Sequence, residues 1–111
     1  MSRRSFDYAH PRYGPLQVVA GWDRPLQHFF ITLEHYRPLC ESERFLFDNL
    51  DSSTWPLPGP YIERLLIGDI RGILEHFRIP IPLNFIVDLL DDAQFDVGSY
   101  DQQYRLPERV R

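Results

Sequence analysis

The chain has 111 residues, of which 43% are hydrophobic, 14% aromatic and 25% charged. This composition is typical of a folded globular protein and excludes a disordered chain. A globular chain of this length buries roughly 65% of its unfolded surface, so a hydrophobic core forms without disulfide or metal support. The net charge of −4 argues against a nucleic-acid-binding domain, because such domains are strongly basic.

Cysteine content and hydropathy indicate the compartment. The single cysteine, Cys40, excludes an internal disulfide. No apolar run approaches the roughly 20 residues of a membrane-spanning helix, and the first residues lack the apolar stretch of a signal peptide. All twelve basic residues are Arg, a bias that a GC-rich bacterial genome would produce. We therefore expect a cytoplasmic bacterial protein that makes no contact with the membrane.

The first segment, residues 1–14, has no hydrophobic period and contains Pro11 and Gly14. Three of its residues are Arg and three are aromatic, and residues 99–111 are also basic, so two basic ends flank an acidic middle. Ends of this kind bind an acidic surface or lie against their own domain. We expect residues 1–14 to be a flexible basic and aromatic arm and residues 15–98 to form a single domain.

Two apolar runs then meet at residues 21–25, whose sequence is GWDRP. The first run is rich in β-branched residues, and the second alternates so that Phe29, Ile31 and Leu33 share one side of a strand. Two strands joined by a five-residue turn with Gly and Pro predict a β-hairpin.

The hairpin turn contains Trp22 and Arg24. In one interpretation Trp22 packs back on the sheet and braces the turn. In the other, Trp22 and Arg24 form a protruding recognition tip, because Trp and Arg are the residue types that dominate binding hot spots.

A third strand is predicted near residues 44–50, with Phe45 and Phe47 on one face and in the same core as the hairpin. Residues 51–60 contain three prolines that prevent regular strand pairing, so we expect a surface loop there. Trp55 anchors this loop and admits the same two interpretations as Trp22.

Two helices follow. The first is predicted from about Pro60 to Phe77 and packs on the hairpin; Gly68 and Gly72 share one of its sides, where a second backbone could approach closely. The second is predicted from Pro82 to between residues 90 and 92. The residues expected in its buried apolar stripe are Leu83, Ile86, Val87 and Leu90.

The last segment, residues 99–111, alternates again. If it is extended, Tyr100, Gln102, Tyr104 and Leu106 lie on one side. This pattern predicts either an edge strand or an extended tail that docks on a partner.

Acidic residues gather at and beyond the end of the second helix, at positions 88, 91, 92 and 96. Their spacing lacks the alternate ligands and the terminal Glu of a calcium-binding loop, so we expect no metal there. Two interpretations stay open: a solvated helix end, or an acidic patch that binds the Arg-bearing ends of the same chain or of another chain.

Motifs of catalysis are missing from the sequence. No two His residues have the spacing of a zinc site, and no nucleophile elbow or phosphate-binding glycine loop occurs. We therefore expect no cofactor, no metal and no catalytic residues. The alternative is a small enzyme or ligand-binding domain with a pocket between sheet and helices, lined by His28, Glu34, Tyr36 and Cys40.

The sequence thus predicts an α+β fold: a small antiparallel sheet of three or four strands, with an N-terminal hairpin, covered on one face by two helices. The function favoured by the sequence is a non-catalytic protein-interaction or regulatory module. Its partner is another protein or a second copy of the chain in a homodimer, without nucleic acid or membrane. The predicted contact residues are Trp22, Arg24, Trp55, Tyr100 and Tyr104.

Overall fold

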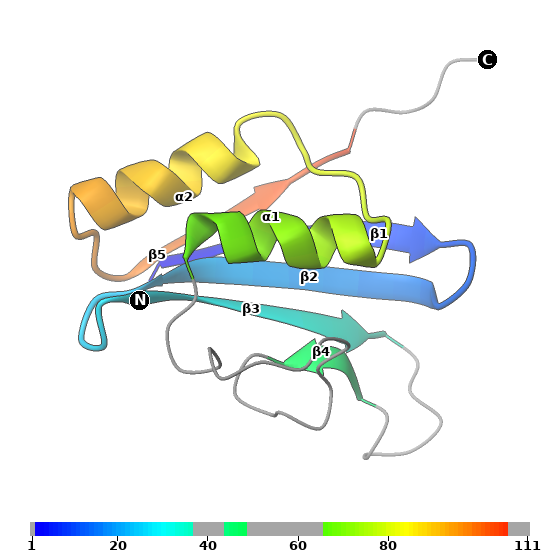
Figure 1. The fold of residues 1–111 in the computed structure, drawn as a ribbon. Coiled ribbons are helices and arrows are strands. Elements are labelled where there is room, and N and C mark those ends of the chain that lie inside the picture. The colour runs from blue at the N-terminus through cyan, green and yellow to red at the C-terminus, as the bar shows by residue number, and fades with distance from the viewer. Residues whose placement is uncertain (1, 37–43, 49–65, 107–111) are drawn as a thin grey trace.

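A computed structural model describes residues 2–36, 44–48 and 66–106. Five strands form one sheet in the order β4-β3-β2-β1-β5, and two helices cover one of its faces (Figure 1). The elements are, in chain order, β1 (Ser2–His10), β2 (Gly14–Asp23), β3 (His28–His35), β4 (Phe45–Asp48), α1 (Ile67–His76), α2 (Phe85–Gln94) and β5 (Tyr100–Tyr104). The predicted α+β class with a one-sided helical layer is confirmed.

The sheet is larger than predicted, and it is mixed. β1 pairs with β2 in antiparallel fashion and with β5 in parallel, whereas β2–β3 and β3–β4 are antiparallel. The prediction of a purely antiparallel sheet of three or four strands was wrong, because it left out the strand formed by the first residues of the chain.

Residues 2–10, expected to belong to an arm, form β1 in the interior of the sheet. Its side toward the helices carries Phe6 and three buried polar side chains, those of Ser2, Arg4 and His10. Hydrophobic periodicity cannot reveal such a strand, because most of its inward positions are polar. Each of these polar groups has a partner from another element; the Ser2 hydroxyl, for example, accepts a hydrogen bond from the Trp22 amide at 2.9 Å.

The predicted hairpin is present as β2 and β3, and β2 extends beyond the predicted residues 16–20 at both ends. Residues 21–23 continue β2, and the turn consists of residues 24–27. Gly21 is required because a Cβ atom there would lie only 1.9 Å from the carbonyl oxygen of Ser2. Phe29, Ile31 and Leu33 are all buried toward the helices, as the alternation predicted.

Strand β4 lies where a third strand was predicted, but its two phenylalanines do not share a face. The register shifts between Leu33 and Glu34, so that Phe47 pairs with Leu33 and Phe45 pairs with Glu34. Phe47 is buried in the core, whereas Phe45 is half-buried and stacks under the guanidinium of Arg44. The β-bulge therefore removes Phe45 from the predicted core.

Helix α1 ends where the sequence predicted, and it buries Ile70 and Leu74 on the sheet. The predicted first turns, from Pro60 to residue 65, lie outside the described residues. A Cβ atom added at Gly68 or Gly72 would meet nothing within 4 Å. Within the described residues, therefore, no second backbone packs closely on these two glycines.

Helix α2 begins three residues later than predicted, after Asn84 in the left-handed conformation with φ of 68°. It buries Phe85, Leu89 and Asp92, and the Phe6 ring meets Phe85 edge to face at 5.1 Å. The predicted buried stripe was wrong. Three of its members are exposed and one is half-buried: Leu83, Val87 and Leu90 are exposed, and Ile86 is half-buried.

The helices divide the sheet between them. α2 packs on β1 and β2, and α1 packs on β3 (Figure 1). No helix of the described residues is long and apolar enough to cross a membrane.

Candidate functional site

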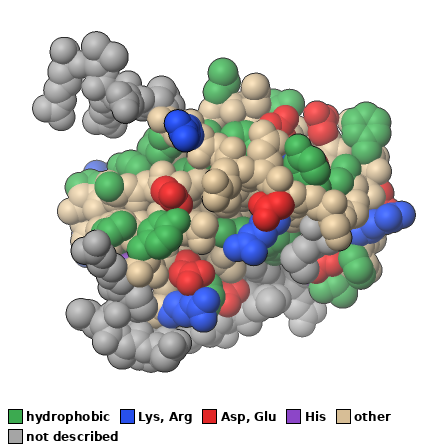
Figure 2. All heavy atoms as spheres, turned by 180° about the vertical axis from the view of Figure 1, so that it is seen from behind, with side chains coloured by type: hydrophobic (Ala, Val, Ile, Leu, Met, Phe, Trp, Pro, Cys, Tyr) green, Lys and Arg blue, Asp and Glu red, His purple; other side chains and the backbone are tan. Residues whose placement is uncertain are grey.

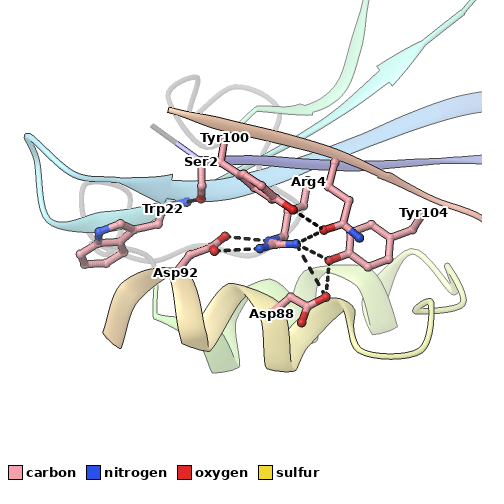
Figure 3. Close-up of polar contacts among 8 residues, drawn as sticks. Ser2, Arg4, Trp22, Asp88, Asp92, Tyr100 and Tyr104 are labelled. Atoms are coloured by element: carbon pink, nitrogen blue, oxygen red, sulfur yellow. Dashed lines mark hydrogen bonds and ion pairs between the residues drawn. The ribbon is translucent and has the colours of Figure 1, made fainter. Parts of the chain in front are cut away.

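The most extensive polar site of the described residues surrounds Arg4, where β1, β5 and α2 meet (Figure 3). Arg4 is 7% exposed, and its guanidinium Nε and Nη2 atoms donate to the two carboxylate oxygens of Asp92 at 2.7 and 2.8 Å. Asp92 is itself 2% exposed. This bidentate geometry is the strongest form of an Arg–carboxylate contact.

Strand β5 completes the site from the other side. Arg4 Nη1 donates to Gln102 Oε1 at 2.5 Å and to the Tyr104 hydroxyl at 2.6 Å. The Tyr104 hydroxyl donates in turn to Asp88 Oδ2 at 2.5 Å, and the Tyr100 ring lies 4.9 Å from the guanidinium carbon. We call this group the Arg4 cluster. Its members are Arg4, Asp88, Asp92, Tyr100, Gln102 and Tyr104.

The electrostatics of the Arg4 cluster fix the charge of its members. The hydrogen bonds to Asp92 raise the pKa of Arg4 above its ordinary value, although burial opposes this shift. Burial, together with the hydrogen bond to Asp88, raises the pKa of Tyr104. The guanidinium therefore stays charged and the phenol stays protonated at neutral pH, so neither group transfers a proton there.

The cluster explains the acidic residues at the end of α2. All three nitrogens of the Arg4 guanidinium donate to groups of the same chain. The guanidinium therefore has no pair of N–H groups left to bind an external carboxylate or phosphate. Of the two interpretations of the acidic segment, a patch that binds an Arg of the same chain is confirmed for Asp92. In the described structure the Arg4 cluster holds α2 and β5 on β1.

The hairpin turn is tied to Asp96, just beyond the C-terminal end of α2. The Trp22 indole N–H donates to Asp96 Oδ1 at 2.9 Å, the Gln27 amide donates to the same oxygen at 2.8 Å, and Arg24 Nε lies 3.3 Å from Oδ2. These hydrogen bonds, that of Trp22 above all, lower the pKa of Asp96. Trp22 is nearly buried and meets Phe29 edge to face at 5.2 Å. It packs back on the sheet, whereas Arg24 is exposed.

The structure does not gather the predicted contact residues into one site. Trp22 and Arg24 meet at Asp96, while Tyr100 and Tyr104 belong to the Arg4 cluster. Tyr100 is 47% exposed and Tyr104 is half-buried. Trp55 lies outside the described residues.

The structure does not place His28 and Glu34, two of the four residues expected to line the alternative pocket, between sheet and helices. His28 and Glu34 alternate with the buried Phe29, Ile31 and Leu33, so they lie on the face away from the helices. That face carries acidic, basic and apolar side chains (Figure 2). Glu34 accepts a hydrogen bond from Arg44 at 2.9 Å.

Tyr36 is likewise engaged with its own chain. Its hydroxyl donates a short hydrogen bond to Asp7, which raises the pKa of Tyr36 to about 12. Cys40, the fourth residue expected in the alternative pocket, lies outside the described residues.

A buried histidine lies at the far end of β1. The amides of Arg12 and Tyr13 donate to His10 Nδ1 at 3.0 and 3.3 Å, so Nε2 carries the proton and donates to the Phe77 carbonyl at 2.6 Å. A hollow of about 520 Å³ borders this residue. Because both ring nitrogens bond to backbone, His10 offers neither to a ligand. The described residues hold no group of three side chains suited to bind a metal ion.

An exposed apolar surface is the feature that sequence analysis misplaced. Val87 and Leu90 are 56% and 44% exposed, and we call these two residues the outer face of α2; Leu83, which is 84% exposed, lies in the turn before the helix. Phe95, at the end of the helix, is also exposed. The helical spacing of this stripe was visible in the sequence, but the spacing does not tell which stripe faces the core.

Comparison with known proteins adds no name to these features. The chain matches no protein-family model, no curated protein and no solved structure. The function therefore has to be inferred from the chemistry of the described side chains.

Proposed function

We propose that the protein is a non-catalytic protein-interaction module that binds its partner through the outer face of α2. The observation that carries this proposal is the exposure of Val87 and Leu90, two large aliphatic side chains three residues apart on α2, with the exposed Leu83 in the turn before the helix. Exposed apolar side chains that adjoin one another, rather than occur singly, mark interaction sites. A helix face of this kind fits an apolar groove or a second amphipathic helix.

The polar groups of the described residues support a binding role over catalysis. The Arg4 cluster saturates its own hydrogen bonds, and His10 uses both ring nitrogens on backbone atoms. A catalytic site needs an acid, base or nucleophile that reaches a substrate. The side chains best suited to those tasks are instead bonded to their own chain.

The Arg4 cluster supports the same proposal by holding α2 in place. Asp92 and Asp88 attach the helix to β1 and β5, and Asp96 attaches its end to the hairpin turn. A binding surface on a fixed element loses little conformational freedom when a partner docks. The contacts that fix the inner side of α2 therefore increase the affinity with which its outer face binds a partner.

The residues singled out from the sequence have two roles in this proposal. Arg24 and Tyr100 keep exposed side chains and are further candidate contacts. Trp22 and Tyr104 instead stabilise the position of α2 through hydrogen bonds to Asp96 and Asp88, respectively. The cytoplasm of a bacterium remains the predicted setting.

The experiment compares three full-length chains: wild type, the double variant Val87→Gln/Leu90→Gln, and the control Leu26→Gln. Leu26 is also an exposed leucine, at 61%, but it lies in the hairpin turn. Equal urea midpoints would establish that all three chains fold, as expected for surface changes. Each chain is then immobilised and used to retain proteins from a bacterial lysate.

We expect one stoichiometric partner that wild type and Leu26→Gln retain and that the double variant loses. A partner retained equally by all three chains would contradict the assignment to α2. If none of the chains retained a partner, the interaction module itself would be refuted.

A further inference from the structure

Strand β5 ends the sheet beside β1, and within the described residues its second edge pairs with no strand (Figure 1). An open edge presents a row of backbone donors and acceptors to any strand that can approach. Proteins protect such edges with Pro, Lys or a bulge. Residues 100–104 contain neither Pro nor Lys, and their only charged side chain is that of Asp101.

The sequence of β5, YDQQY, is nearly the same in both directions. In an antiparallel pair centred on Gln102, Tyr100 lies opposite Tyr104 of the second copy and Asp101 lies opposite Gln103 of the second copy. We propose that two copies of the chain pair through β5 in this register and form a two-fold symmetric dimer with one ten-stranded sheet. This inference does not depend on the outer face of α2.

The register is consistent with the layers of the fold. Gln102, at the two-fold axis, faces itself, so each residue pairs with one of the same side of the sheet and both helical layers lie on one face. Tyr100 and Tyr104 lie on the helix side, next to Arg4, and form two aromatic cross-strand pairs. Such pairs stabilise antiparallel sheets.

Contacts within the chain fix β5 in the extended conformation that pairing with a second strand requires. Arg4 donates to both Gln102 and Tyr104, which attaches β5 to β1 along its length. A fixed strand loses little freedom on pairing. No like charges oppose one another in the proposed register, because the partner position of Asp101 is the neutral Gln103. These features favour a second copy over a strand of unrelated sequence.

Gln103 gives a direct test, because its side chain is exposed on the face away from the Arg4 cluster. Gln103→Asp places a carboxylate opposite Asp101 of the second copy, twice in each dimer. Gln103→Arg places a guanidinium at the same positions. The double variant Asp101→Arg/Gln103→Asp puts a positive charge at position 101 and a negative charge at position 103, which gives two opposite-charge pairs in each dimer. The dimer dissociation constant of each full-length chain is measured by sedimentation equilibrium.

We expect Gln103→Asp to weaken the wild-type dimer by roughly 2- to 30-fold, and Gln103→Arg and the double variant to strengthen it by a similar factor. A wild-type chain that stays monomeric at every concentration would overturn the proposal. A dimer whose dissociation constant is the same in all three variants as in wild type would also overturn it. The Val87→Gln/Leu90→Gln chain should dimerise like wild type, so the two proposals can fail separately.

Discussion

The two faces of helix α2 differ in what they bury. The inner face buries a carboxylate, Asp92, together with Phe85 and Leu89, while the outer face exposes Val87 and Leu90. A charged residue inside and a leucine outside reverse the usual arrangement of an amphipathic helix. The difference shows that the partner of a side chain, and not its polarity alone, determines which face of a helix turns inward.

The partner in this case is Arg4, which lies 88 residues before Asp92 in the chain. A buried carboxylate without a counterion is very costly, but a bidentate guanidinium supplies both charge and hydrogen bonds. With that cost offset, Phe85 and Leu89 pack fully against the sheet. The outer aliphatic residues are then left for a partner, and three experiments examine this division of the helix.

The largest effect is expected from breaking the buried ion pair. Asp92→Ala removes the buried bidentate partner of Arg4, leaves only the half-buried Asp88 carboxylate at 3.7 Å, and should lower the free energy of unfolding by about 3–5 kcal/mol. Asp91→Ala, which changes the exposed neighbour, should alter it by no more than about 0.5 kcal/mol. Urea denaturation of the three chains measures both values.

A companion variant separates the charge from the packing. Arg4→Met/Asp92→Leu removes both charges and should recover most of the stability that Asp92→Ala loses, because apolar pairs of similar volume replace buried ion pairs well. A loss below about 1 kcal/mol for Asp92→Ala alone would mean that the pair does not hold α2.

Adjacent leucines compare the two faces without a change of charge. Leu89→Ala opens a cavity in the core and should cost about 2–5 kcal/mol. Leu90→Ala removes an exposed side chain and should change stability by no more than about 0.5 kcal/mol. Thermal and urea unfolding give the comparison, and equal costs at the two positions would be incompatible with the orientation of α2.

The smallest effect concerns Asp96 and is a dependence on pH. The folded protein lowers the pKa of this carboxyl below its ordinary 3.8, so the ionised form stabilises the fold above that value. This contribution disappears as the pH falls through the lower, folded-state pKa. Wild type should therefore be more stable than Asp96→Asn at neutral pH, and the difference should vanish in strong acid.

Urea unfolding of both chains at neutral and strongly acidic pH measures this difference. Arg24→Gln serves as the control, because it leaves the hydrogen bonds from Trp22 and Gln27 in place. A stability difference between wild type and Asp96→Asn that persists in strong acid would refute the role of the carboxylate.

Local alternation predicted the parts of the fold in which apolar residues face the core. The alternation places Phe29, Ile31 and Leu33 on one side of their strand, and Tyr100, Gln102 and Tyr104 on one side of theirs, because each set depends only on the period of a strand. The acidic segment was also connected with Arg residues before the particular pair was known. These predictions needed no knowledge of distant contacts.

The failures share a physical cause. Ser2, Arg4 and His10 are buried only because Trp22, Asp92 and Phe77 supply their hydrogen bonds, and those partners are remote in sequence. The Arg4–Asp92 pair lies on the buried face of α2, which is not the predicted stripe. A pattern that counts apolar residues cannot anticipate a charge that is neutralised from the other end of the chain.

The separation of Arg4 from Asp92 has a consequence for the order of events during synthesis. Chains grow from the amino end, so β1 is complete long before its counterion exists. Until then the guanidinium is more stable in water than in the core, so the burial of Arg4 on β1 is unfavourable. The burial of Arg4 against α2 is therefore completed only after residue 92 has been synthesised.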